Sequence, residues 1–416
     1  MNKEQLFFQE HLKNQILPFW DSAFDEVYGG VFTCYSNDGV SLVSEDKYTW
    51  SQARMLWCLS YLLDSAACRR IFSDETLETY RKRADELYAF LHAHVLLNKE
   101  DEVCAFLLSR EGRPMEPVYG AGFYTSFYAD CFVVMAYARY ALLTGDTTVA
   151  IEAMTIFQKM KSLLDKGIVK TDPYPLPKGA RAQSVPMILC NTTYELGSCL
   201  KGLGFEQSKA ILQESKNHAL LLLSDFVDQD TMRLDEIRFS DGRLDSLLAR
   251  HHNPGHAVEC MWFCLDALGS GSANTLSQIV KTSLALGWDE EFGGLLRYTD
   301  RDGGTVSGTV DDDCFSQLVA STWSYKLWWP HAEALYACLK FFIATEDPLL
   351  KQWYERIKEY TFKTFPAEQG REWIQIRKRD GEGEDRVMAL AVKDPYHIFR
   401  MLLLVIDLLE DREDVI

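Results

Sequence analysis

The chain has 416 residues, of which 47% are hydrophobic, 12% aromatic and 25% charged, so disordered, collagen-like and low-complexity classes are excluded. Its 61 acidic residues outnumber 43 Lys and Arg residues, which gives a net charge of −18 and leaves no basic stripe for a nucleic-acid backbone or an anionic membrane. We therefore expect a packed globular protein that binds neither nucleic acid nor membrane.

Apolar residues recur at the helical spacing of 3.6 residues in twelve segments, which predicts twelve amphipathic helices covering most of the chain. In chain order we expect these helices near residues 3–18, 48–66, 76–95, 122–144, 147–165, 184–201, 205–227, 254–268, 272–286, 326–344, 347–363 and 394–411.

A second pattern lies between some of the predicted helices. A short β-prone run is followed by an acidic residue and a glycine, which is typical of a hairpin turn. The turns are at Asp38-Gly39, Glu111-Gly112, Asp241-Gly242, Asp302-Gly303 and Asp380-Gly381. Their glycines are 73, 130, 61 and 78 residues apart, and the gap of 130 is about twice the others. We infer six units of about 70 residues, one of which lacks the turn signature.

Two helices and one hairpin in each of six units predict an all-α fold, an (α/α)6 barrel with an inner and an outer circle of helices and short β-hairpins in its connecting loops. Closure of the ring would make residues 1–416 a single catalytic domain. An open solenoid is the alternative, although the chain has no obvious polar end caps.

The cysteines and the N-terminus predict where the protein resides. Eleven cysteines with no C-x-x-C spacing indicate reduced thiols, so we expect a cytoplasmic protein. The charged N-terminal residues do not resemble a signal peptide, and an apolar run such as residues 401–406 is far too short to span a membrane.

Two histidines open predicted helices in the same way. His256 follows Pro254 and shares a helix face with Glu259, and His397 follows Pro395 and shares a face with Arg400. Each histidine alone is more often structural than catalytic. However, they are 141 residues apart, about two units, so in a six-unit ring both can project into one central cavity as an acid/base pair.

Two further clusters carry candidate binding residues. Trp328, Trp329 and Glu333 lie close together at a predicted helix start, where the indoles either stack on a sugar or pack in the core. Arg54 lies among apolar positions of another helix and needs a partner if it is buried.

Together these residues make the sequence similar to the N-acylglucosamine 2-epimerase family, which includes cellobiose 2-epimerases and related aldose–ketose isomerases. The motifs that carry the resemblance run in family order over nearly the whole chain: Tyr28-Gly29-Gly30 with Asp38-Gly39, Trp50-x-Gln52-x-Arg54, Asn253-Pro254-Gly255-His256-x-x-Glu259, Lys326-x-Trp328-Trp329-Pro330-His331-Ala332-Glu333, Glu372-Trp373 and His397-x-x-Arg400.

The resemblance implies an (α/α)6 barrel and an isomerase in which His256 and His397 are the catalytic acid and base. It also implies a substrate site formed by Arg54, Glu259, Glu333, Arg400, Trp328 and Trp329. A small sugar is the expected partner, with no metal and no required cofactor. Some relatives are homodimers or are activated by ATP without consuming it, so a homodimer and an ATP activator remain expectations.

The segment Ser184-Val-Pro-Met-Ile-Leu-Cys-Asn191 resembles the acylglucosamine enzymes and lacks the histidine expected in disaccharide epimerases and mannose isomerases. This favours interconversion of N-acetyl-D-glucosamine and N-acetyl-D-mannosamine, a step of sialic acid metabolism, over cellobiose epimerisation or mannose-type isomerisation. Phe399 departs from the proline expected at its position.

Three other hypotheses stay open. An (α/α)6 glycoside hydrolase would use Glu259 and Glu333 as its carboxylates. A noncatalytic binding protein would need neither histidine, and a metal enzyme could ligate an ion through His256, Glu259 and His397.

Overall fold

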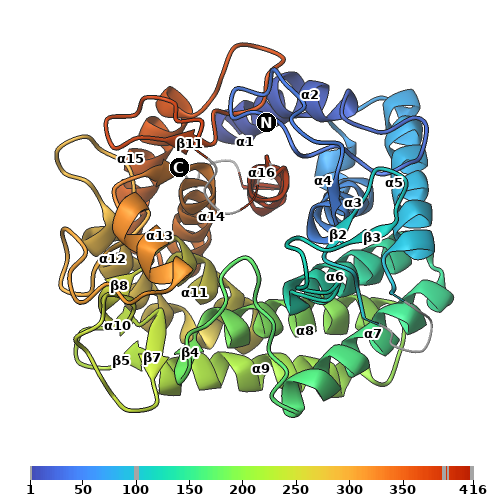
Figure 1. Cartoon of the computed structure of the whole chain (residues 1–416). Helices are drawn as coiled ribbons and strands as arrows, with labels where there is room; N and C mark the ends of the chain where they lie inside the picture. The colour runs from blue at the N-terminus through green and yellow to red at the C-terminus, as the bar shows by residue number, and fades with distance from the viewer. Residues whose placement is uncertain (1, 98–102, 387–389, 391–392, 413–416) are drawn as a thin grey trace.

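The computed structural model describes residues 2–97, 103–386, 390 and 393–412. Its helices form two concentric circles, and Figure 1 looks onto the face of this ring. The inner circle consists of α3 (Thr49–Asp64), α6 (Phe127–Thr144), α8 (Ser184–Gly202), α11 (Pro254–Leu268), α14 (Trp328–Thr345) and α16 (Tyr396–Leu408). Each inner helix packs against the next, and α16 packs against α3, so the ring is closed and the open-solenoid alternative is wrong.

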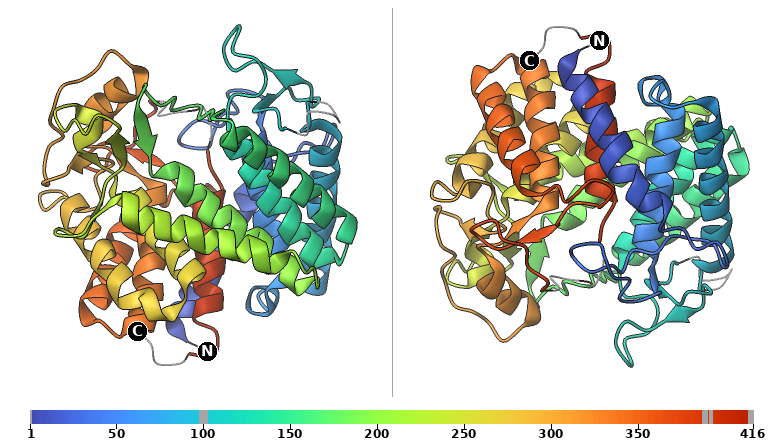
Figure 2. Two further views of the ribbon diagram at one scale, coloured as in Figure 1. Left: turned by 90° about the horizontal axis from the view of Figure 1, so that it is seen from below. Right: turned by 90° about the horizontal axis from the view of Figure 1, so that it is seen from above.

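The outer circle covers the inner one. Five outer helices directly follow their inner partners: α5 (Asp74–His94), α7 (Thr147–Asp165), α9 (Ser208–Asp225), α12 (Ala273–Gly287) and α15 (Pro348–Thr364). The sixth outer position is taken by the N-terminal segment, which comprises α1 (Lys3–His11), the π-helical η1 (Leu12–Ile16) and α2 (Leu17–Asp21). Because α1 packs against α16, the two ends of the chain form the sixth pair, as the right-hand view of Figure 2 shows.

All twelve predicted helices are present, although the first is interrupted by η1 and α6 starts five residues later than expected. Short additional helices are α4 (Ala66–Arg69), α10 (Leu247–Arg250), α13 (Cys314–Thr322) and the 3₁₀ turn η2 (Ser270–Ser272). None of the described helices combines the length and the apolar character needed to span a bilayer.

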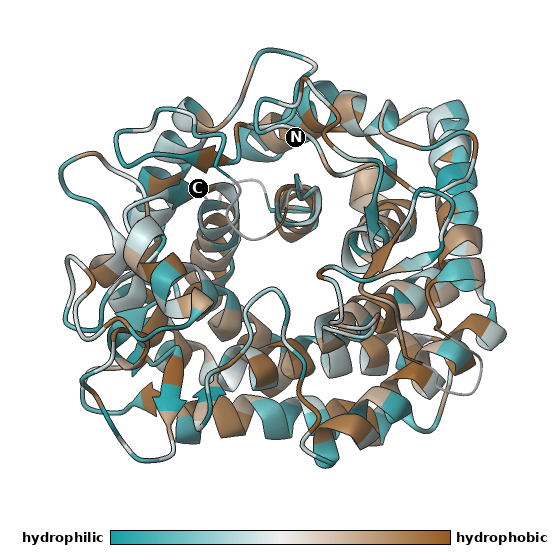
Figure 3. Ribbon diagram, in the orientation of Figure 1, coloured by the Kyte–Doolittle hydropathy of each residue, from teal (hydrophilic) through white to brown (hydrophobic). Residues whose placement is uncertain are grey.

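Local sequence explains both circles of helices. Outer helix α15 begins at the capping residue Asp347, followed by a proline at the first helical position. It buries one stripe, formed by Leu350, Trp353, Tyr354 and Ile357, because only its inward face meets the ring. Inner helices are covered on more sides, and α11 buries nearly every residue. Figure 3 shows hydrophobic residues concentrated along the helices and hydrophilic residues in the long loops.

Four of the six inner helices are preceded by a short strand that pairs, antiparallel, with a strand that follows the outer partner helix. Four copies of this unit use β1 (Lys47–Tyr48) with β2 (Leu107–Leu108), β4 (Ala180–Ala182) with β7 (Ile237–Phe239), β8 (His251–His252) with β9 (Thr299–Asp300), and β10 (Lys326–Leu327) with β11 (Ile376–Arg377).

The remaining two copies are reduced to single contacts. A bridge joins Ser126 to Thr171 in the second unit, and the Lys393 amide donates to the Thr33 carbonyl at 2.7 Å in the sixth. The six units inferred from the turn spacing are therefore present. The unit without an acidic residue followed by glycine is the second, where Asp172-Pro173 follows the bridge.

The predicted hairpins are only partly confirmed. The Glu111-Gly112 turn joins β2 to β3 (Pro114–Met115), and single bridges flank Asp38-Gly39 and Asp380-Gly381. The Asp241-Gly242 and Asp302-Gly303 turns are tight, but β7 and β9 pair with the remote strands β4 and β8, so the hairpin prediction is wrong there. Packing of the two helices between those strands brings them together. One further pair, β5 (Val227–Asp228) with β6 (Arg233–Leu234), closes the α9 loop.

Candidate active site

A cavity of about 240 Å³ opens at the end of the barrel where all six inner helices begin. Every inner helix contributes residues from its first two turns to the lining, including Arg54, Tyr128, Met187, His256, Trp329 and His397. Since the same unit is repeated six times, the six helix N-termini point toward one space. The repeat thus converts six separate helix starts into one site.

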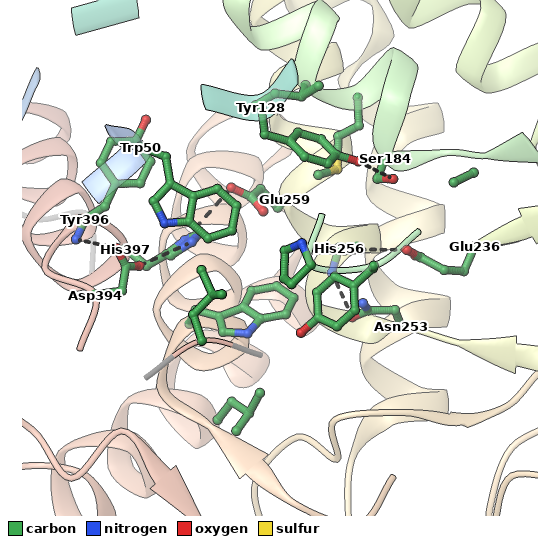
Figure 4. Close-up of a pocket in the computed structure, with 18 of the residues that line it drawn as sticks. Trp50, Tyr128, Ser184, Glu236, Asn253, His256, Glu259, Asp394, Tyr396 and His397 are labelled. Carbon is green, nitrogen blue, oxygen red and sulfur yellow. Dashed lines mark hydrogen bonds and ion pairs between the residues drawn. The ribbon is translucent and has the colours of Figure 1, made fainter. Parts of the chain in front are cut away.

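His256 lies in the first turn of α11, where the Asn253 side chain caps the helix by accepting a hydrogen bond from the His256 amide at 3.1 Å. The His256 Nδ1 atom is 2.7 Å from Glu236 Oε1 (Figure 4). Gln183 Nε2 donates to the other oxygen of that buried carboxylate at 3.1 Å.

The two groups shift each other's pKa. Burial alone would lower the pKa of His256, but the charge and hydrogen bond of Glu236 outweigh it and raise the pKa above its usual value. Burial would raise the pKa of Glu236, yet His256 holds it below the usual range. The pair therefore favours an imidazolium beside a carboxylate.

His397 opens α16 with a similar arrangement. Its Nδ1 atom is 2.7 Å from Glu333 Oε1, and its Nε2 atom is 3.6 Å from Asp394 Oδ2. In both histidines Nδ1 donates a hydrogen bond to a carboxylate oxygen, so Nδ1 carries the proton and Nε2 is the nitrogen that can exchange a proton with a substrate.

Glu333 also belongs to a buried ion network. Arg400 Nη2 donates to Glu333 Oε1 at 2.7 Å and to Glu259 Oε1 at 2.5 Å, and Trp262 Nε1 donates to Glu333 Oε2 at 2.9 Å. Burial would raise the pKa of Glu333, but the Arg400 guanidinium and His397 hold it well below its usual value. Glu333 is therefore ionised near neutral pH.

The two adjacent indoles at the start of α14 both line the cavity. The Trp329 ring lies close to both imidazoles, with its centroid 5.0 Å from that of His256 and 5.7 Å from that of His397. Trp328 is also part of the wall and is only partly buried. Both indoles are therefore placed at the cavity wall, and their predicted role in binding a sugar stays a prediction.

Arg54 reaches the cavity from α3. Its Nη1 atom donates to Asp394 Oδ1 at 3.2 Å, and its guanidinium lies 4.0 Å from the Phe132 ring centroid. The partner expected for a buried arginine is therefore Asp394, which also lies beside His397. This carboxylate links the arginine to the second histidine.

All eight predicted site residues line the cavity or contact a residue that does. Sequence reasoning missed Glu236, Gln183 and Asp394 as site residues. Asp394 is adjacent to a recognised motif. Glu236 and Gln183 belong to no recognised motif, and only the pairing of β4 with β7 shows that they lie together at the site.

One group of described residues has the spacing of metal ligands, with one ligand atom each from Glu259, Glu333 and His397 within 4.8 Å of one another. This set contains Glu333 in place of the expected His256. Arg400 already donates to both carboxylates, so a guanidinium supplies the positive charge that a cation would bring. The residues present therefore fit a metal ion poorly.

Known proteins resemble the chain over nearly its full length. A family profile described as N-acylglucosamine 2-epimerase (GlcNAc 2-epimerase) matches residues 30–401. The N-acylglucosamine 2-epimerase of Bos taurus is 30% identical over 96% of this chain and 89% of its own, and that of Homo sapiens is 26% identical over 94% and 86%. A cellobiose 2-epimerase of Eubacterium cellulosolvens is 23% identical over 96% and 97%.

Solved structures share the fold. The cellobiose 2-epimerase from Bacillus thermoamylovorans superposes with a TM-score of 0.74 at 19% identity, covering 98% of this chain and 99% of that one. A D-mannose isomerase gives 0.72 at 16% identity, with coverage of 96% and 97%. The (α/α)6 barrel and the family predicted from the sequence are thus confirmed. The chain belongs to the N-acylglucosamine 2-epimerase family.

Proposed function

We propose that this protein interconverts N-acetyl-D-glucosamine and N-acetyl-D-mannosamine by removing and returning the proton at C2. Membership of the family supports the reaction class, and relatives from four mammals carry the name N-acylglucosamine 2-epimerase. The observation that carries the proposal is that His256 and His397 line one cavity, and each has Nδ1 bound to a buried carboxylate.

Epimerisation at C2 needs two proton-transfer groups. The ring opens to the aldehyde, one base removes the C2 proton to form an enolate that keeps the acetamido nitrogen on C2, and an acid returns a proton to the opposite face. An imidazole suits both steps because it titrates near neutral pH, and such a group contributes about 10² to 10⁴-fold to the rate. His256 and His397 fill these roles, each through Nε2.

The enolate carries negative charge on the former carbonyl oxygen. Arg54 supplies a guanidinium at the cavity wall, held in place by Asp394. All six inner helices begin at this cavity, and the partial positive charge at a helix N-terminus favours a bound anion. Arg400 forms ion pairs with both Glu259 and Glu333 and so offsets part of the negative charge that would oppose the charge of the intermediate.

The wall also favours an acetylated monosaccharide over a disaccharide. Ser184 and Met187 of the segment that resembles the acylglucosamine enzymes line the cavity, and no histidine stands in that segment. Trp328 and Trp329 offer faces on which a sugar ring can stack. Cellobiose epimerisation and mannose isomerisation are the alternatives, since structures with those names share the fold.

A glycoside hydrolase is a weaker candidate. An α-1,6-mannanase variant from Salegentibacter shares the fold with a TM-score of 0.55 at 12% identity, which supports the architecture alone. Hydrolysis needs a protonated carboxylic acid beside the glycosidic oxygen. Glu333, one of the two candidates, has its pKa held well below the usual value and is bound to Arg400, so it is a poor acid.

Incubation with N-acetylmannosamine in deuterated water tests the proposal. An epimerase incorporates deuterium at C2 and produces N-acetylglucosamine, which proton NMR detects. Cellobiose, mannose and glucose serve as comparison substrates under the same conditions. Deuterium at C2 of one of those sugars alone would move the protein to another branch of the family, and no exchange with any sugar would overturn the proposal.

No required cofactor enters this reaction. Activation by ATP without turnover and assembly into a homodimer remain predictions, which equilibrium binding of ATP and sedimentation analysis would check.

A further inference from the structure

Glu236 lies outside every motif that carries the family resemblance, yet it holds the imidazole of His256. We propose that Glu236 is the positioning residue of His256 and that Gln183 fixes the Glu236 carboxylate in turn. This inference rests on the proposed function, because it assigns a role to a partner of one of the two acid/base groups.

The fold delivers the two residues together. In the β4–β7 pair, Ala182 is opposite Ile237; Gln183 directly follows Ala182, and Glu236 directly precedes Ile237. The Gln183 amide donates to the Glu236 carbonyl at 3.0 Å, which extends the ladder by one step. Their side chains then meet at 3.1 Å, and both residues are buried. Neither carboxylate oxygen of Glu236 is therefore left without a donor.

The chemistry of the contact gives Glu236 two effects on His256. An ionised carboxylate only accepts hydrogen bonds, so it keeps the proton on Nδ1 and leaves Nε2 for exchange with substrate. Its charge also stabilises the imidazolium that forms when His256 takes up the C2 proton.

The second histidine is held differently. Its partner Glu333 also binds the cationic Arg400, whereas Glu236 binds the neutral amide of Gln183. The charge of Glu236 therefore acts more fully on its histidine than the charge of Glu333 does. Removal of Glu236 should therefore change the titration of His256.

Other charged groups also face His256. Glu259 of α11 stabilises its imidazolium, and Arg297, which precedes β9, opposes it. His251 of β8 also interacts electrostatically with Glu236, but burial lowers the pKa of His251 and keeps it neutral near pH 7. Because these groups stay in place in a Glu236 variant, a change in titration reports the loss of Glu236.

Two variants separate charge from position. Glu236→Gln keeps an acceptor oxygen for Nδ1 but removes the charge, and Glu236→Ala removes both. Asp241→Asn is the matched control, because it removes a carboxylate from an exposed turn five residues away. We expect kcat for C2 exchange to fall at least about tenfold in Glu236→Gln and further in Glu236→Ala, within the range of a general acid–base group.

The pH profile distinguishes a positioning role from a structural one. In Glu236→Gln, the limb of the kcat/KM profile that belongs to His256 should move to lower pH, since the lost charge had raised that pKa, while the other limb stays. Glu236→Ala should change kcat more than KM. The inference is overturned if the folded Glu236→Ala protein keeps both its kcat and its pH profile within about twofold of the parent.

Nitrogen-15 NMR of the imidazoles gives a readout without substrate. The parent protein should show a protonated Nδ1 in His256 with a deshielded proton, and this signal should disappear in a His256→Asn assignment control and shift in Glu236→Gln. An unprotonated Nδ1 in the parent would overturn the positioning role even if exchange occurs. Absence of C2 exchange in the parent, with the NMR signature present, would overturn the proposed function alone.

Discussion

The indole of Trp329 lies against the imidazole of His256, with ring centroids 5.0 Å apart and planes inclined by 39°. The same indole also lies 5.7 Å from the His397 ring, so one side chain of α14 contacts both histidines. This contact depends on Gly255. A Cβ atom at that position would be 2.6 Å from Trp329 Cζ3 and 2.8 Å from Pro330 Cβ. The missing side chain therefore lets the starts of α11 and α14 approach each other.

Gly255→Ala should displace Trp329 from its position against the two histidines. Because misplacement of about 1 Å in a site can cost about 10²-fold, we expect kcat for C2 exchange to fall by that order. Overpacking should also lower the free energy of unfolding by about 1–3 kcal/mol. Gly271→Ala is the control, since a Cβ atom at that position would have no neighbour within 4 Å and its backbone is unstrained. Unchanged exchange kinetics in Gly255→Ala would contradict this account.

His397→Ala should abolish C2 exchange and leave the fold intact. The residue contacts Glu333 and lines the cavity, so its loss removes one of the two proton-transfer groups and costs about 10² to 10⁴-fold in rate. Circular dichroism checks the fold, and deuterium incorporation measures the rate. His92→Ala removes an exposed histidine from α5 and should behave as the parent does. Near-normal turnover in His397→Ala would rule out the catalytic role.

Arg400→Met should destabilise the protein strongly. The substitution leaves Glu259 and Glu333 buried without their shared cation, and breaking a buried ion pair in this way costs about 3–5 kcal/mol. Urea unfolding measures the loss. Arg81→Met, which removes an exposed partner of Asp85 on α5, should cost less than about 1 kcal/mol. Equal losses in the two variants would show that the buried network contributes little.

Glu372→Gln should change how stability depends on pH. Burial raises the pKa of Glu372 to about 7, even though Lys393 lies 3.2 Å away and opposes the shift. Below about pH 4.3, the folded and unfolded states both carry the proton and the stabilising contribution is complete. As the pH rises toward 7, only the unfolded chain loses the proton, so the contribution falls.

The measurement is the difference in unfolding free energy between the parent and Glu372→Gln at pH 5 and at pH 8. Relative to the variant, the parent should be less stable at pH 8 than at pH 5, because glutamine does not titrate. A difference that is the same at both pH values would show that Glu372 titrates at its ordinary pKa.

The helices and the main site residues could be predicted from the sequence. Helix hydrogen bonds join residues four apart in the chain. The buried apolar residues of a helix such as α15 therefore recur at helical spacing, and this pattern can be recognised from the sequence alone. The starts of α11 and α16 were visible for a similar reason, since a proline precedes His256 and His397 by a short, fixed distance.

The partners of those residues could not be predicted. Glu236 lies beside a short strand whose local sequence suggested a hairpin, but that strand pairs with one more than fifty residues earlier, and Glu236 thereby meets Gln183 and His256. Strand pairing depends on which backbones the helices bring together, and a strand of two or three residues carries too little pattern to specify its partner.

Local order in the sequence therefore determined the twelve helices, the sixfold repeat and the two histidines. Only the tertiary structure decided that α1 completes the last unit with α16, that Trp329 contacts both imidazoles, and that Glu236 holds one of them. These contacts join residues distant in the chain, and their geometry follows from how the closed ring packs.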